Sequence, residues 1–195
     1  MNKKHLGDAY DYWKGSLISI LTKKHKIISN LAVVPMRTDN RWSERRSRRY
    51  KNLLNLHKKN SVYHKDKFKN PQVLRHKYFA SIPVDCDLFL DPDIGICAGE
   101  HTKEKHITIA DISCLLCDHN NGKRVLMVYQ HSRRDKKWVS KTQREIKKQI
   151  SGISCYPHEC GQVAMFFVSW NKKRIENIRK ALTPYTAAKK RIWPK

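Results

Sequence analysis

The sequence has few acidic residues and no long apolar run. Asp and Glu number 17 against 41 Lys and Arg, which gives a formal net charge of +24 over 195 residues. No stretch approaches the 18 or more apolar residues of a membrane span, and the charged residues 1–14 are unlike the start of a secretory signal. These absences predict a cytoplasmic protein with no membrane partner.

The sequence also has few glycines and no glycine-rich loop. Its seven glycines and seven prolines are scattered rather than gathered into a linker, and no internal repeat is visible. The motifs of phosphate-binding loops, dinucleotide-binding folds, zinc metalloproteases and serine hydrolases are absent. We therefore predict a single domain over residues 1–195 and find no motif that favours any of these four enzyme classes.

What the sequence has in excess is positive charge, and this predicts a polyanionic partner. A surplus of this size repels itself unless an anion neutralises it, and nucleic acid is the leading candidate. A solvated surface that only keeps the protein soluble is the alternative. Residues 41–77, a predicted basic helix and loop, hold 13 basic and 2 acidic residues with aromatic residues between them. Cations can hold phosphates and aromatic rings can stack on exposed bases.

The predicted nucleic-acid-binding residues are cations of this segment and of a second cluster, four cations that begin two residues after His131. They are Arg41, Arg45, Arg46, Arg48, Arg49, Lys51, Arg133, Arg134, Lys136 and Lys137. The sequence does not discriminate between DNA and RNA as the partner.

Apolar patterns predict strands that alternate with helices. The strands are expected at residues 31–36, 84–90, 125–129 and 163–168, and the helices at residues 4–23, 42–56, 108–116, 138–150 and 172–182, with a further short helix after Pro71. Such alternation is typical of a mostly parallel sheet with crossover helices. We predict a Rossmann-like α/β core over residues 84–182, preceded by a basic helical N-terminal segment and followed by a basic tail at residues 185–195.

Polar residues follow the predicted strands, at the edge where ligands bind in open α/β sheets. In chain order these residues are Asp39, Asp91 with Asp93, His131, and Ser169. Two carboxylates beside an imidazole can hold Mg²⁺ or Mn²⁺, which would activate water. Asp91, Asp93 and His131 are therefore the candidate catalytic residues, with Asp91 and Asp93 as metal ligands and Asp39 as a further candidate ligand.

This arrangement leads to the hypothesis of a nucleic-acid-binding protein that is a metal-dependent phosphodiesterase or nuclease. In a competing interpretation, Asp91 and Asp93 only form a turn with Gly95, since Asp and Gly are common turn residues. The protein would then be a non-catalytic nucleic-acid-binding or inhibitory protein. The sequence leaves open whether it is an enzyme.

The cysteines suggest a zinc site, but a structural role is preferred. The potential ligands fall into two clusters, Cys114, Cys117 and His119, and Cys155, His158 and Cys160. Cys114 and Cys117 lie three residues apart in a predicted apolar helix, where thiols pack as small hydrophobic groups. We therefore expect both in the core, with reduced thiols, and no zinc.

The second predicted strand ends in the run Asp87-Leu88-Phe89-Leu90-Asp91-Pro92-Asp93. This run resembles the strand-ending Asp-Pro-Pro-aromatic motif of S-adenosylmethionine-dependent amino-methyltransferases, with Asp93 in place of the second proline and Ile94 in place of the aromatic residue. No glycine-rich cofactor loop follows residues 31–36. The resemblance extends to the strand order of residues 84–182. It implies a Rossmann-like fold, an acidic residue that orients a target amine, and a third hypothesis, a divergent methyltransferase.

Overall fold

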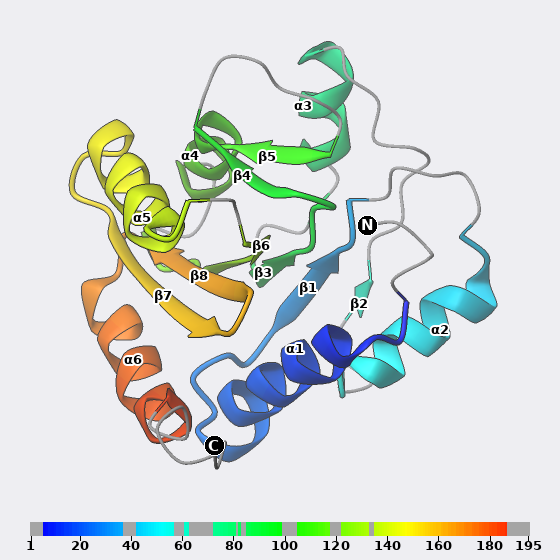
Figure 1. Cartoon of the computed structure of the whole chain (residues 1–195). Coiled ribbons are helices and arrows are strands. Elements are labelled where there is room, and N and C mark those ends of the chain that lie inside the picture. The colour runs from blue at the N-terminus through cyan, green and yellow to red at the C-terminus, as the bar shows by residue number, and fades with distance from the viewer. Residues whose placement is uncertain are drawn as a thin grey trace.

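A computed structural model describes residues 6–36, 42–56, 61–62, 72–80, 82, 85–98, 105–117, 122–132 and 135–186 (Figure 1). Its centre is a six-stranded sheet with the order β2-β1-β3-β6-β8-β7. The strands are β1 (Leu31–Val34), β2 (Ser61–Val62), β3 (Asp87–Leu90), β6 (Leu126–His131), β7 (Ser154–Cys160) and β8 (Val163–Ser169). A separate parallel pair consists of β4 (Gly95–Cys97) and β5 (His106–Thr108).

Strand direction confirms a mixed α/β protein with a mostly parallel central sheet. β2, β1, β3 and β6 are parallel, whereas β8 is antiparallel to β6 and β7 is antiparallel to β8. β7 and β8 are joined by a short turn that contains Gly161 at φ 60°, and strands joined so tightly pair antiparallel. The prediction that Ser169 lies at the carboxyl edge of the parallel strands is therefore wrong, because β8 runs the other way.

Helices cover both faces of the sheet. On one face lie α1 (Ala9–Ser19), the π-helix η2 (Ile20–Lys24), α2 (Glu44–Leu53) and α6 (Lys172–Thr186). On the other face lie α3 (Gln72–Ala80), α4 (Ile109–Cys117) and α5 (Trp138–Gln149), together with β4 and β5. Successive strand residues alternate between these two layers, so Phe89 packs under α1 and α2 while Leu90 faces the opposite layer.

The central strands are apolar throughout because both faces are covered. Every residue of β1, β3 and β8 is buried. Figure 1 shows α2 near β2 at one side of the sheet, α6 beside β7 at the other, and α1 running between them.

Side-chain hydrogen bonds explain two helix boundaries. The predicted capping box of α4 is confirmed: the Thr108 Oγ1 atom accepts from the Asp111 amide at 2.9 Å, and Asp111 Oδ2 accepts from the Thr108 amide at 2.8 Å. α6 continues beyond its predicted end, through Pro184. There the hydroxyls of Thr183 and Thr186 donate to carbonyls of the last turns, including those of Arg179 and Leu182.

Candidate functional site

Asp91, the first residue after β3, is buried and fully engaged with protein donors. Its side chain is 2% exposed. The Lys14 Nζ atom donates to Asp91 Oδ1 at 3.1 Å and to Oδ2 at 3.0 Å, and the Tyr50 hydroxyl donates to Oδ2. The carboxylate therefore faces α1 and α2, whose side chains cover the carboxyl edge of the sheet at this point.

Lys14 also holds a second carboxylate. Its Nζ atom lies 3.0 Å from Asp11 Oδ1, and both side chains are almost completely buried. The N-terminus of α1 sets this geometry: the Asp8 side chain caps the helix by accepting from the amides of Tyr10 and Asp11. Asp11 and Lys14 then stand one turn apart on the same side of α1. We call Asp11, Lys14, Tyr50 and Asp91 the buried charge cluster.

The cluster shifts the pKa values of three of its members. Burial raises the pKa of Asp11, and the nearby Lys14 ammonium opposes this. Burial alone would lower the pKa of Lys14, but Asp91 and Asp11 together raise it above its ordinary value. Burial, and then Asp91, raise the pKa of Tyr50 well above its ordinary value. Lys14 is consequently an ammonium and Tyr50 a neutral phenol at neutral pH, so both can donate to Asp91.

These contacts bear on the predicted metal site. A metal ligand must direct an oxygen lone pair at the ion, whereas both oxygens of Asp91 accept from Lys14 or Tyr50. Asp93 is partly exposed in the loop that leads to β4, and Asp39 lies outside the described residues. Within the described part of the chain, no three His, Cys, Asp or Glu side chains gather into a potential metal site.

His131, the third candidate catalytic residue, ends β6 next to the buried charge cluster. Its ring lies edge-on to Tyr129 at 4.9 Å between ring centroids and to Tyr10 at 5.9 Å. The Lys14 Nζ atom lies 4.0 Å from the centre of the Tyr129 ring. The structure thus brings His131 and Asp91 to the same edge of the sheet, where Tyr129 and Lys14 lie between them.

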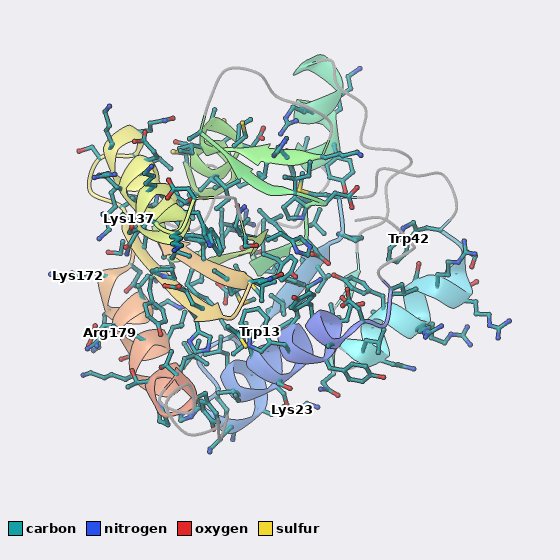
Figure 2. The ribbon with its side chains drawn as sticks, in the orientation of Figure 1. Trp13, Lys23, Trp42, Lys137, Lys172 and Arg179 are labelled. Atoms are coloured by element: carbon teal, nitrogen blue, oxygen red, sulfur yellow. The ribbon has the colours of Figure 1, made fainter. Side chains whose placement is uncertain are left out.

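The two cysteine clusters do not converge. In β7, Cys155 packs on the α5 side of the sheet, whereas His158 stacks on Trp13 of α1 with 6.2 Å between ring centroids. Figure 2 shows Trp13 between α1 and the sheet. Cys114 and Cys117 are exposed on α4, so the prediction that they lie in the core is wrong: they fall on the outward side of that helix. His119 lies outside the described residues.

The predicted nucleic-acid-binding residues of α2 lie on its outer side. Arg45, Arg48 and Arg49 are exposed, while Arg46 and Lys51 are partly buried. The helix is anchored by Tyr50, which is 0% exposed, and begins after Ser43, whose hydroxyl accepts from the Arg46 amide. Of the remaining predicted cations, Lys136 and Lys137 are exposed beside α5, and Arg41, Arg133 and Arg134 lie outside the described residues.

Positive charge is distributed unequally over the two helical layers. The net charges of α2, η2 and α6 are +4, +2 and +4, and the one Asp and one Lys of α1 cancel, which gives this layer +10. On the other side, α3, α4 and α5 have +2, −1 and +3, which gives +4. We call the outer surface of α1, η2, α2 and α6 the basic helical face. Figure 2 shows Lys172 and Arg179 on its outward side and Lys23 beyond the end of α1.

A cavity of about 370 Å³ lies at the amino edge of the sheet, where Ser169 is also found. Arg174 spans it: the guanidinium donates to both oxygens of Asp87, at 2.8 and 2.7 Å, and to the carbonyls of Ile27 and Lys123. These bonds connect the start of α6 with the starts of β1 and β3. This is a structural brace between α6 and the sheet.

Comparison with known proteins does not assign a family. No protein-family model, no curated protein and no solved structure matches the chain. In the described part of the chain, none of the helices is long and apolar enough to cross a membrane. Its function is therefore inferred below from its own residues.

Proposed function

We propose that the protein binds nucleic acid through its basic helical face. The observation that carries this proposal is the unequal distribution of charge, +10 on this layer against +4 on the opposite one. A surface that only maintained solubility would have no reason to concentrate cations on one side. Nucleic-acid phosphates would neutralise the repulsion among these cations and release counterions.

Within this face, α2 is the best-formed phosphate-contacting element. Tyr50 and Leu54 hold it against the sheet, so its orientation is fixed. Its three exposed arginines, Arg45, Arg48 and Arg49, extend from the opposite side into solvent. Guanidinium groups on a rigid helix can donate to phosphate oxygens without ordering a loop first.

Replacing these three arginines by glutamine should weaken nucleic-acid binding by at least about 10-fold, because each lost phosphate contact removes released counterions. The slope of log K against log salt should fall by about 2 to 3. Fluorescence anisotropy with labelled DNA and RNA over a range of salt concentrations measures both quantities. The side chains are exposed, so thermal unfolding should be unchanged.

The matched control replaces three exposed cations of the opposite layer, Arg144, Lys147 and Lys148 of α5, by glutamine. It removes the same charge from the protein and should have a much smaller effect on binding. Equal losses for the α2 and α5 variants would mean that binding follows total charge and that the basic helical face is not the site.

A divergent methyltransferase is the second candidate. It is favoured by the Asp91-Pro92 strand end and by a Rossmann-like strand order in which the reversed β8 lies between β6 and β7. Against it, the Lys14 ammonium already lies at the Asp91 carboxylate, where the resemblance places a target amine. Metal-dependent cleavage is not part of the proposal, because both oxygens of Asp91 accept from protein donors.

Isothermal titration calorimetry with S-adenosylmethionine tests the second candidate. We expect no saturable heat up to about 1 mM ligand, the range in which even weak specific ligands are detected, because Asp91 is occupied and no glycine-rich loop follows β1. Saturable binding of one S-adenosylmethionine per chain would contradict this expectation and would make methyl transfer to the bound nucleic acid the preferred function.

A further inference from the structure

The outward side of α1 carries no negative charge. Tyr12, Ser16, Ser19 and Lys23 follow one another at spacings of four, three and four residues, which places them on one stripe along α1 and η2. Asp11, the one acid of α1, points inward to Lys14. A polyanion that crosses α1 would therefore meet an aromatic ring, two hydroxyls and an ammonium.

Exposed aromatic side chains gather on this same face. Among the described residues, the exposed large hydrophobic side chains are Tyr12 at 60%, Tyr185 at 41% and Ile94 at 39%. Both tyrosines belong to the basic helical face, Tyr12 to α1 and Tyr185 to α6. The Lys24 Nζ atom donates to the Tyr185 hydroxyl at 3.0 Å, so a cation accompanies this ring.

Cations flank Tyr12 on both sides. α1 contacts α2, and η2 contacts α6, so α1 lies between the two basic helices (Figure 1). The acids of α2 and α6 are Glu44 and Glu176, and each is paired within its helix, with Arg48 at 3.4 Å and Arg179 at 2.7 Å. Along the basic helical face the remaining cations are thus left to attract phosphates.

We infer that the nucleic acid bound by this face is single stranded and that Tyr12 stacks on one of its bases. The inference rests on the proposed function and adds the class of substrate. An aromatic ring between cations can receive an unpaired base while its neighbours hold the backbone. In a duplex the flat faces of the bases are covered by their neighbours, so Tyr12 would gain no stacking partner and the phosphates alone would be contacted.

The test compares Tyr12→Ala with Tyr12→Phe, using a labelled oligonucleotide of about 20 nucleotides, longer than a typical site of about 4 to 16. Single-stranded and duplex forms are titrated separately by fluorescence anisotropy. Tyr12→Ala should weaken single-strand binding by about 10-fold, in line with the loss of one stacked base, and leave duplex binding nearly unchanged. Tyr12→Phe should bind like the wild type. Ile94→Ala, an exposed change outside this face, should alter neither affinity.

Two results would overturn the inference. One is equal or tighter binding of the duplex by the wild type, and the other is an unchanged single-strand affinity in Tyr12→Ala. Either result leaves the proposed function intact if the α2 arginine variant still loses affinity. If the wild type binds anionic vesicles or heparin but neither form of the oligonucleotide, the proposed function itself fails, and this inference fails with it.

Discussion

Lys14→Met should lower the free energy of unfolding by about 3 to 5 kcal/mol, the usual loss when one partner of a buried ion pair is removed. Lys14 is 4% exposed and is the described cation within 4 Å of both Asp11 and Asp91. Without the ammonium, two carboxylates would be buried near each other with too little compensation. Urea unfolding, followed by tryptophan fluorescence, measures the loss.

The control is the double variant Lys14→Met, Asp91→Asn, which removes a charge of each sign. It should recover part of the loss, because contacting residues are energetically coupled. A loss of less than about 1 kcal/mol in the single variant would show that the pair behaves like an exposed salt bridge.

Alkaline pH provides a second measure of the same contact. The pKa of Lys14 is raised in the folded protein, so its contribution is complete below the ordinary lysine pKa of about 10.4 and is lost as pH rises through the folded value. The raised pKa of Tyr50 acts in the same direction, because the folded state retains that proton longer than the unfolded chain. The wild type should therefore lose stability above about pH 10, and Lys14→Met should lose less over this interval.

The central strands could be predicted from the sequence because both of their faces are buried. Leu31–Val34, Asp87–Leu90 and Val163–Ser169 are buried throughout, and a continuous apolar run identifies such strands. β7 could not be recognised in this way. It lies at the edge of the sheet, alternates buried with partly exposed residues and contains Pro157. Without β7 there was no hairpin in the prediction, and the direction of β8 was wrong.

For the candidate site, the sequence could predict the edge of the sheet but not the contacts there. Asp91 and His131 follow parallel neighbouring strands, so their common edge follows from strand order. The partner of Asp91 is Lys14, 77 residues away in the chain, and only tertiary packing brings the two together. The available signal was the pair Asp11 and Lys14 at helical spacing beside the apolar residues of α1, an unusual place for two charges.

Gln130→Leu should lower the free energy of unfolding by about 3 kcal/mol, because three hydrogen bonds of one buried amide are lost and each buried polar group left without its partner costs about 1 to 3 kcal/mol. Gln130 is 0% exposed. Its Oε1 atom accepts from the Ile96 amide at 2.6 Å, and its Nε2 atom donates to the carbonyls of Ile94 and His131. Gly95 has φ +112°, and a Cβ atom there would come within 2.3 Å of Gln130.

Gln130 thus determines the path of the chain after Asp91, and its loss should also increase amide hydrogen exchange at residues 94–96. The matched control is Gln143→Leu, since the described side-chain bond of Gln143 is a single one, from Nε2 to the Cys155 carbonyl. That variant should lose only about 1 kcal/mol, the net contribution of one ordinary hydrogen bond. Equal losses in the two variants would mean that the three bonds of Gln130 act no differently from one. The loop after β3 would then be fixed by the pairing of β4 with β5 instead.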